Sequence, residues 1–250
     1  EQICGARLTT NIGRIGGFER DFTPDVYRRL DEFLKDFPKA LKEFENMVMR
    51  NRIFMDRTIN TGPISGERAL EYGFTGPNLR AAGVDYDVRV MTPYSSYEDF
   101  DFIIPIGTQG DTYDRFCVRE EEMWQSLSII RQALDKMPKT NEFFADVPEF
   151  YLPPKDAVYN TMEGLIWHFK IVMGEVNVPK GQVYHCVEGG NGELGFYLVS
   201  DGGRQPFRLH FRRPCFIYYQ AYPEMIKGAL LSDAIITMSS MNVIAGELDA

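Results

Sequence analysis

The sequence predicts an α+β fold that is mainly α-helical. Apolar residues recur at helical spacing over residues 25–51 and about 112–137, whereas the clearest alternating pattern lies within residues 182–219. That region carries a hairpin signal: a strand from Gly192 ends in the turn Ser200–Gly203, and a second strand covers Phe207–Phe211. Helices followed by a small antiparallel sheet near the C-terminus are typical of an α+β arrangement, not of a doubly wound sheet.

The other elements are expected from residues that cap or break regular structure. A Ser before a helix, or a Gly or Pro after it, marks where the helix begins or ends. The expected order is a helix end running into a loop over residues 7–18, a helix over 25–51 that Pro38 kinks or divides, a short helix over 67–72 between Ser65 and Gly73, a loop-rich region over 76–110 with one strand at Phe102–Ile106, the long helix, a helix over 156–173, the hairpin region, a short helix over 223–231, and a closing segment over 234–249 without clear period.

The chain is expected to form a single domain over residues 1–250. Its helical core would cover about 1–178, its hairpin region about 182–219, and its closing helix and tail 220–250. A chain of 250 residues is long enough for one large domain or for two small ones. It does not begin with Met, so it is expected to be a fragment or a processed chain.

Composition limits the classes of function. The net charge of −9 argues against nucleic acid or an anionic membrane surface as the main partner. No apolar run approaches the ~20 residues that cross a bilayer. The four cysteines, Cys4, Cys117, Cys186 and Cys215, have no short spacing, so free thiols in a reducing compartment are expected rather than a zinc site or a disulfide framework.

No self-contained catalytic constellation is found. His168 is expected on a helix, and His185 and His210 are expected on strands; none has a second metal ligand at zinc spacing. The glycine-rich pieces Gly13–Gly17 and Gly189–Gly192 match neither a dinucleotide-binding turn nor a triphosphate-binding loop. The three histidines are therefore expected to be structural.

The predicted long helix carries many charges near its start. The run Glu120–Glu122 is expected to face water. Arg115 and Arg119 lie one turn apart, near Asp111 and Asp114, and are expected to form an internal ion-pair network; an anion-binding site is the alternative.

Short motifs with a common resemblance are spread along the whole chain. The most specific is GELGFYLVSDG at Gly192–Gly202, followed by Pro206-Phe207-Arg208. The others are Cys4–Arg7 with Asn11 and Arg14–Gly17, Asn51–Ile53 with Arg57–Ile59, Ala69–Gly76, Pro105–Arg115, Gln125–Ile130, Pro153–Lys155 with Met162-Glu163 and His168–Lys170, and Gly246–Asp249. In this order they resemble the D subunit of respiratory complex I, a family related to the large subunit of nickel–iron hydrogenases.

The resemblance implies a hydrogenase large-subunit-like helical core and a role in a proton-pumping NADH:quinone oxidoreductase. The chain would be the quinone-site subunit and would bind no metal or cofactor itself. NADH and the iron–sulfur clusters would be bound by partner subunits, and the partner with the terminal cluster would form the quinone cavity with this chain. Other peripheral-arm and membrane-arm subunits would be partners, and nucleic acid would not. The location would be peripheral to the inner membrane, on its cytoplasmic side, or on the matrix side in mitochondria.

The resemblance carries over a wall of the quinone cavity and no catalytic residue. That wall would comprise Gly5 and Arg7 on one side and Asn242, Ile244 and Asp249 in the closing segment. From the residues alone, Ile244 would be assigned to packing.

Three points set limits to the carry-over. Asn242 stands where the family usually has Asp, and Ala250 stands where the family ends in Arg. The β-rich part that holds the family's quinone head-group ligands is expected upstream of Glu1, so the chain alone is expected to be inactive and to bind quinone weakly. Two rival functions remain: the catalytic large subunit of a membrane-bound energy-converting hydrogenase, and a non-catalytic assembly or scaffold paralogue.

Overall fold

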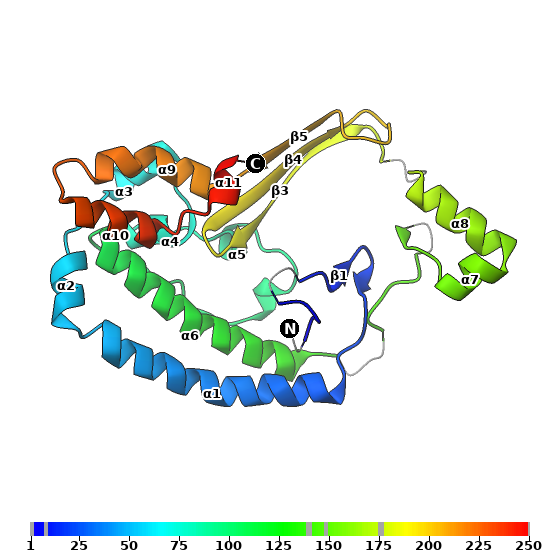
Figure 1. Cartoon of the computed structure of the whole chain (residues 1–250), viewed down its shortest axis with the longest axis horizontal. Helices are drawn as coiled ribbons and strands as arrows, with labels where there is room; N and C mark the ends of the chain where they lie inside the picture. Colours follow the sequence, from blue (N-terminus) through cyan, green and yellow to red (C-terminus); the bar gives the residue numbers. More distant parts are fainter. Residues whose placement is uncertain (1–2, 8–9, 139–141, 148–149, 175–177, 250) are drawn as a thin grey trace. The chain divides into compact units, whose positions relative to one another are not determined.

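A computed structural model describes residues 3–7, 10–138, 142–147, 150–174 and 178–249 (Figure 1). The chain divides into two compact units. The first unit comprises Glu1–Asp36, Met137–Val183 and Leu198–Leu209, and the second unit comprises Phe37–Lys136, Tyr184–Tyr197 and His210–Ala250. The expected organisation as a single domain remains a prediction.

The α+β prediction is confirmed, because helices dominate and a three-stranded sheet of order β3-β4-β5 lies in the C-terminal part of the chain. The elements, coloured along the sequence in Figure 1, are β1 (Gly13–Arg14), β2 (Gly17–Phe18), α1 (Pro24–Val48), α2 (Arg52–Thr58), α3 (Gly66–Tyr72), α4 (Gly76–Ala81), α5 (Val88–Met91), the 3₁₀ helix η1 (Tyr97–Asp99), α6 (Thr112–Lys136), α7 (Lys155–Asn160), α8 (Met162–Val172), β3 (Gly181–Gly189), β4 (Gly192–Ser200), β5 (Arg208–Arg212), α9 (Pro214–Met225), α10 (Leu231–Met241) and α11 (Ala245–Asp249).

Elements with strong local signals lie where the sequence predicts them. The long helix is α6, and the predicted hairpin is β4 with β5. Ser65 caps α3 by accepting from the Arg68 N–H, and Gly73 ends α3 at a positive φ of 81°. Pro38 does not divide α1, which continues through it as one helix.

Two predictions in the N-terminal half are wrong. The described part of residues 7–18 contains no helix end but the antiparallel pair β1–β2, because Gly16 and Gly17 turn the chain at positive φ. Residues Phe102–Ile106 form no strand. Their backbone bonds a side chain instead: the Ile103 N–H donates to Gln125 of α6 at 3.0 Å.

The C-terminal helix boundaries also differ from the prediction. Thr161 is extended and caps α8, so residues 156–173 form two helices, α7 and α8. The strands end at Arg212 and α9 begins at Pro214, so residues 223–231 are not a separate helix. The closing segment, expected to lack a period, forms α10 and α11, with Thr237 and Met241 buried one turn apart.

The hydrophobic core of the second unit lies among α3, α4, α9 and α10. Its buried members are Ile64, Ala69, Phe74, Leu79, Tyr218, Ala221, Met225 and Met241. Tyr218 is fully buried, and its hydroxyl donates to the backbone, with Thr75 O at 2.7 Å. The Tyr218 hydroxyl therefore holds Thr75, the residue that precedes α4.

A buried charge cluster joins α4, α5, α6 and β3. Arg80 is 1% exposed, and its guanidinium reaches Asp87 at 3.2 Å, Glu188 at 2.9 Å and Glu122 at 3.0 Å. It also donates to the Tyr86 carbonyl at 3.0 Å. Buried charges of this kind are tolerated only where hydrogen bonds satisfy nearly every polar atom.

The prediction that the run Glu120–Glu122 faces water holds for Glu121, which is exposed, and is wrong for Glu120 and Glu122. Glu122 pairs with Arg80, and Glu120 is only 6% exposed. The Trp124 indole N–H bonds both Glu120, at 2.9 Å, and Glu45 of α1, at 2.6 Å. Burial and the neighbouring Glu45 carboxylate raise the pKa of Glu120 to about 7.

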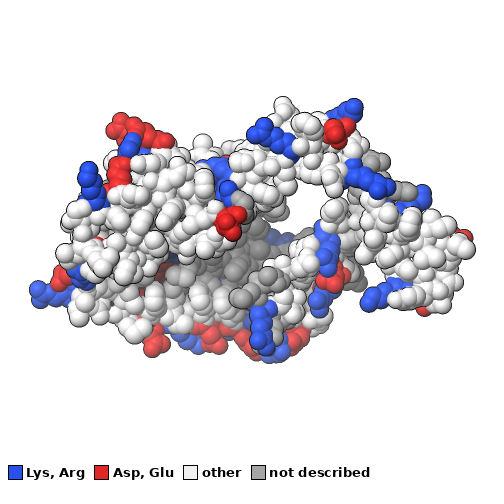
Figure 2. Space-filling view, turned by 45° about the horizontal axis from the view of Figure 1, so that its top comes forward, with Lys and Arg blue, Asp and Glu red and all other residues white. Residues whose placement is uncertain are grey.

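The surface carries both signs of charge. On the face shown in Figure 2, Lys and Arg lie next to Asp and Glu over much of the outline. Exposed pairs on α1, such as Arg28 with Glu32 at 2.6 Å, follow the helical spacing that places them together. None of the described helices has the length and apolar character that a bilayer-spanning segment needs.

Replacing Arg80 is expected to cost far more stability than replacing an exposed arginine. Arg80→Met leaves Glu188 buried without its cation and removes one of the two arginines that pair with Asp87, so the free energy of unfolding should fall by about 3–5 kcal/mol. Arg68→Met is the control, because it breaks a 2.9 Å pair with Glu224 that is about half exposed. Urea unfolding of both variants measures the difference, and equal losses would contradict the role of Arg80.

Glu120 should make stability depend on pH. Its pKa rises from 4.5 to about 7 on folding, so the folded state binds more protons between these values. Its contribution to the free energy of unfolding is therefore present below about pH 4.5 and is lost as pH rises to about 7. Glu120→Gln should remove this fall, whereas Glu121→Gln, on the exposed side of α6, should retain it. The free energy of unfolding is measured by urea unfolding at several pH values. If it changes with pH in the same way in wild type and in Glu120→Gln, Glu120 is not the group responsible.

Candidate functional site

The end of α10 is held by side chains from three other parts of the second unit. Helix ends leave their last carbonyls without partners in the helix. Here these carbonyls accept from outside: Ser240 O from Arg119 of α6 at 2.6 Å, Met241 O from Asn78 of α4 at 3.2 Å, and Asn242 O from Asn191 of the β3–β4 turn at 3.3 Å. The exit from α10 is thus fixed to α6, α4 and the sheet.

Asn242 forms the turn that follows. Its backbone is left-handed, with φ 55° and ψ 48°, a conformation that Asn adopts more easily than most residues. Its side-chain amide donates to the Asn191 side chain at 2.6 Å. Cys215, which is buried, bonds Glu247 of α11 through its backbone N–H at 3.0 Å. The turn and α11 are therefore anchored from both sides.

A pocket of about 370 Å³ lies beside this turn. Its lining residues are Phe54, Thr112, Phe116, Arg119, Ile236, Ser239, Ser240 and Asn242. Aromatic and aliphatic side chains make up much of the wall, and a few polar groups converge on it. Such a pocket suits an apolar ring that carries hydrogen-bonding substituents.

Two arginines of α6, one fully buried and one partly buried, give this region positive charge. Arg115 is fully buried and donates to Gly110 O, to Gly62 O and to Ser240 Oγ at 2.8–2.9 Å. Arg119 bonds backbone and amide oxygens, and its buried Nε has no hydrogen-bond partner. Burial lowers the pKa of Arg115 to about 9, and it also lowers the pKa of Arg119.

The predicted ion-pair network of these arginines is therefore wrong. Within the described residues, Arg115 and Arg119 pair with no carboxylate. Asp111 instead accepts from the backbone N–H groups of Asn60 and Asp114, at 2.7 and 2.9 Å. Asp114 accepts from the Thr108 N–H at 2.7 Å. Asp111 and Asp114 thus bond backbone N–H groups near the start of α6, whereas Arg115 and Arg119 bond Ser240 at the end of α10.

Of the five predicted wall residues, Asn242 alone is among those that line the 370 Å³ pocket. Asn242, Ile244 and Asp249 lie in one segment of the second unit, from the end of α10 to the end of α11, and Ile244 is 47% exposed. Gly5 and Arg7 belong to the first unit, where Gly5 has a positive φ of 74°. The departure at Ala250 lies outside the described residues.

Sequence reasoning missed Asn78 and Asn191 and assigned Arg119 to other partners. No local pattern separates Asn78 from any other helical Asn, and Asn191 falls in the glycine-rich turn Gly189–Gly192, whose sequence resembles no known binding loop. The histidines lie as predicted, with His168 on α8, His185 on β3 and His210 on β5. The described residues contain no cluster of three His, Cys, Asp or Glu side chains that could hold a metal ion.

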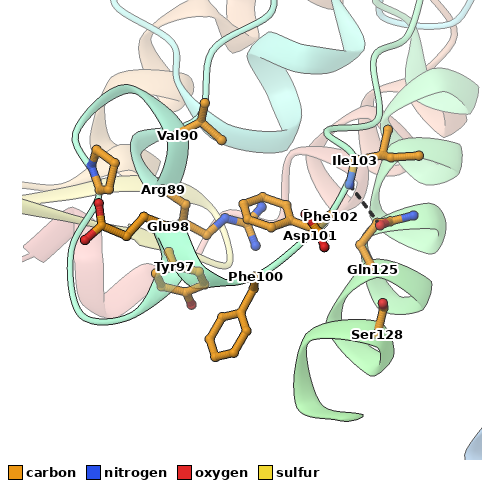
Figure 3. A pocket seen from close by; sticks show the side chains of 11 residues that line it. Arg89, Val90, Tyr97, Glu98, Phe100, Asp101, Phe102, Ile103, Gln125 and Ser128 are labelled. Atoms are coloured by element: carbon orange, nitrogen blue, oxygen red, sulfur yellow. Dashed lines mark hydrogen bonds between the residues drawn. The ribbon is translucent and has the colours of Figure 1, made fainter. Parts of the chain in front are cut away.

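A larger pocket, of about 560 Å³, opens between the loop around η1 and α6 (Figure 3). There the Arg89 guanidinium lies over the Phe102 ring at 4.9 Å and over the Tyr97 ring at 5.8 Å. Arg89 already pairs with buried Asp87 at 2.6 Å. Its charge is thus used within the protein, and this pocket contains none of the predicted wall residues.

Comparison with known proteins identifies the family. The family model for "Respiratory-chain NADH dehydrogenase, 49 Kd subunit" matches residues 1–250. The chain belongs to this family. It is 75% identical over its whole length to the D subunit of NADH-quinone oxidoreductase from Flavobacterium johnsoniae and 56% identical to that from Leptospira biflexa, and it spans 61% of each relative. It is 47% identical to the C/D subunit of NADH-quinone oxidoreductase from Bdellovibrio bacteriovorus, of which it spans 44%.

Family membership confirms the resemblance that the motifs indicated from one end of the chain to the other. Neither the hydrogenase hypothesis nor the scaffold hypothesis is favoured by the names of these relatives. The chain spans about three fifths of the length of its first relatives, so the activity of the whole protein is a matter for proposal.

Asn242 should be replaceable by Gly at lower cost than by Ala. Both changes remove the side-chain bond from Asn242 to Asn191, but only Gly adopts φ 55° without a steric penalty. Asn242→Ala should therefore be less stable than Asn242→Gly by about 1 kcal/mol. Urea unfolding of the two variants provides the comparison. An Ala variant as stable as the Gly variant would show that the left-handed turn is not maintained.

Proposed function

We propose that this chain is the quinone-site subunit of a proton-pumping NADH:quinone oxidoreductase and forms part of the wall of the quinone cavity. The observation that carries the proposal is the pocket beside the Asn242 turn, in a chain of the 49 kDa subunit family. The relatives are D subunits of NADH-quinone oxidoreductase, and this supports the reaction class.

The chemistry of the pocket suits a quinone head group. The rings of Phe54 and Phe116 and the side chain of Ile236 offer apolar contact to a flat ring. Asn242 and Ser239 offer polar groups at the same wall, where they can bond the carbonyl oxygens of the ring. The nearby positive charge of Arg115 and Arg119 favours the electron-rich oxygens that develop when a quinone is reduced.

In this proposal the chain binds and orients its substrate, and electrons come from elsewhere. A partner subunit holds the terminal iron–sulfur cluster and closes the cavity, and NADH is oxidised at other subunits. Gly5 and Arg7 contribute a second side of the wall, and Ile244 and Asp249 extend the side that Asn242 begins. The protein is peripheral to the inner membrane, on the cytoplasmic or matrix side, and contacts peripheral-arm and membrane-arm subunits.

Filling the pocket should weaken quinone binding in the complete enzyme. Ile236→Phe adds a ring inside the pocket, so the KM for quinone should rise roughly tenfold. Ile235→Phe is the matched control, because Ile235 is the adjacent residue of α10 and is 66% exposed. NADH oxidation with a hydrophilic acceptor that bypasses the cavity should be equal in both variants. An unchanged KM for Ile236→Phe, or equal rises for both, would refute the proposal.

A further inference from the structure

The end of α10 depends on a neighbouring helix for its cap. Asn242 supplies the left-handed turn, but carbonyls of the last turn are bonded by side chains from outside α10. The C-terminus of a helix carries partial negative charge, so a cation placed there is favourable. Arg119 places such a cation 2.6 Å from Ser240 O.

Arg119 also acts on the next carbonyl, through Asn78. Its Nη2 donates to the Asn78 side-chain oxygen at 3.0 Å, which leaves the Asn78 amide N–H₂ turned toward Met241 O at 3.2 Å. Asn78 is fully buried, so its side-chain oxygen depends on this bond. The Arg119 guanidinium therefore holds two successive carbonyls before the Asn242 turn, Ser240 O directly and Met241 O through Asn78.

The N–H groups of Arg119 are directed at the protein. Besides Ser240 O and Asn78, Nη1 donates to Arg115 O at 3.1 Å, and Nε is buried. The side chain lines the pocket, but its hydrogen bonds run to the helix end and not into the pocket space. Its geometry is that of a residue that holds a wall in place.

We infer that Arg119 is a positioning residue for quinone binding, which it controls by fixing the end of α10 and the Asn242 turn. This inference rests on the proposed function of the pocket. Arg119 holds residues 242–247 in place and does not itself contact the substrate.

The test uses the complete enzyme complex carrying Arg119→Met or Arg119→Lys in its full-length chain. Met keeps much of the side-chain volume without charge or hydrogen bonds, and Lys keeps the charge but cannot bond Ser240 O and Asn78 with a fixed fork. Arg131→Met, at an exposed position of α6, is the control. Hydrogen exchange of residues 243–247, the KM for quinone and the rate with a bypassing acceptor are measured.

The expected result for Arg119→Met is exchange roughly tenfold faster at residues 243–247 and a quinone KM raised roughly tenfold, with the bypass rate unchanged. Arg119→Lys should give smaller changes in the same direction, and Arg131→Met should give none. If Arg119→Met does not assemble, the Lys variant decides by the same criteria.

Two results overturn the inference and are distinguishable from each other. In the first result, Ile236→Phe raises the KM for quinone, but the Arg119 variants show unchanged hydrogen exchange or an unchanged KM. The pocket then binds quinone, and Arg119 does not position its wall. An unchanged KM in the Arg119 variants and in Ile236→Phe removes the pocket from quinone binding, and the inference falls with the proposed function.

Discussion

The buried guanidinium of Arg80 is the contact on which the second unit depends. It is surrounded by carboxylates from α6, β3 and the start of α5, so three elements that are distant in sequence meet at one cation. Its bond to Glu122 fixes α6 against α4. Arg119 lies three residues before Glu122 on α6, on the same side of the helix, and is thereby aimed at the end of α10. Two contacts thus link α6 to α4: Glu122 with Arg80, and Arg119 with Asn78.

Helix α6 buries a polar stripe. Arg115, Arg119 and Glu122 follow the spacing i, i+4, i+7, which normally marks the apolar face of a helix. At one end of the stripe, Glu122 is neutralised by Arg80, whereas Arg115 and Arg119 bond only oxygens of neutral groups. The helix therefore carries compensated charge beside α4 and uncompensated positive charge beside the pocket. Buried positive charge without a carboxylate partner lowers the stability of the folded state.

Local signals explain what the sequence could predict. Ser65 and Gly73 mark α3 because capping acts within a few residues, and the β4–β5 hairpin is indicated by its own turn residues. The charged stripe of α6 could not be separated from a solvated face, because period alone does not show which partner neutralises a charge. The family resemblance predicts Asn242 and Ile244 as wall residues, but the roles of Asn78 and Asn191 depend on contacts between residues 51 to 163 positions apart in the sequence.

The residue at position 242 links the turn to the charge of the pocket. The resemblance leads one to expect Asp there, but a carboxylate could not donate to Asn191 as the Asn242 amide does at 2.6 Å. It would also add negative charge to a pocket that Arg119 lines. With Asn the turn is neutral and doubly bonded to Asn191, so the arginine charge stays uncompensated. With Asp part of that charge would be neutralised, and the Asn191 amide would have to rotate so that its N–H₂ meets the new acceptor. The same backbone turn is thus compatible with two electrostatic states of the wall, and this chain has the more positive one.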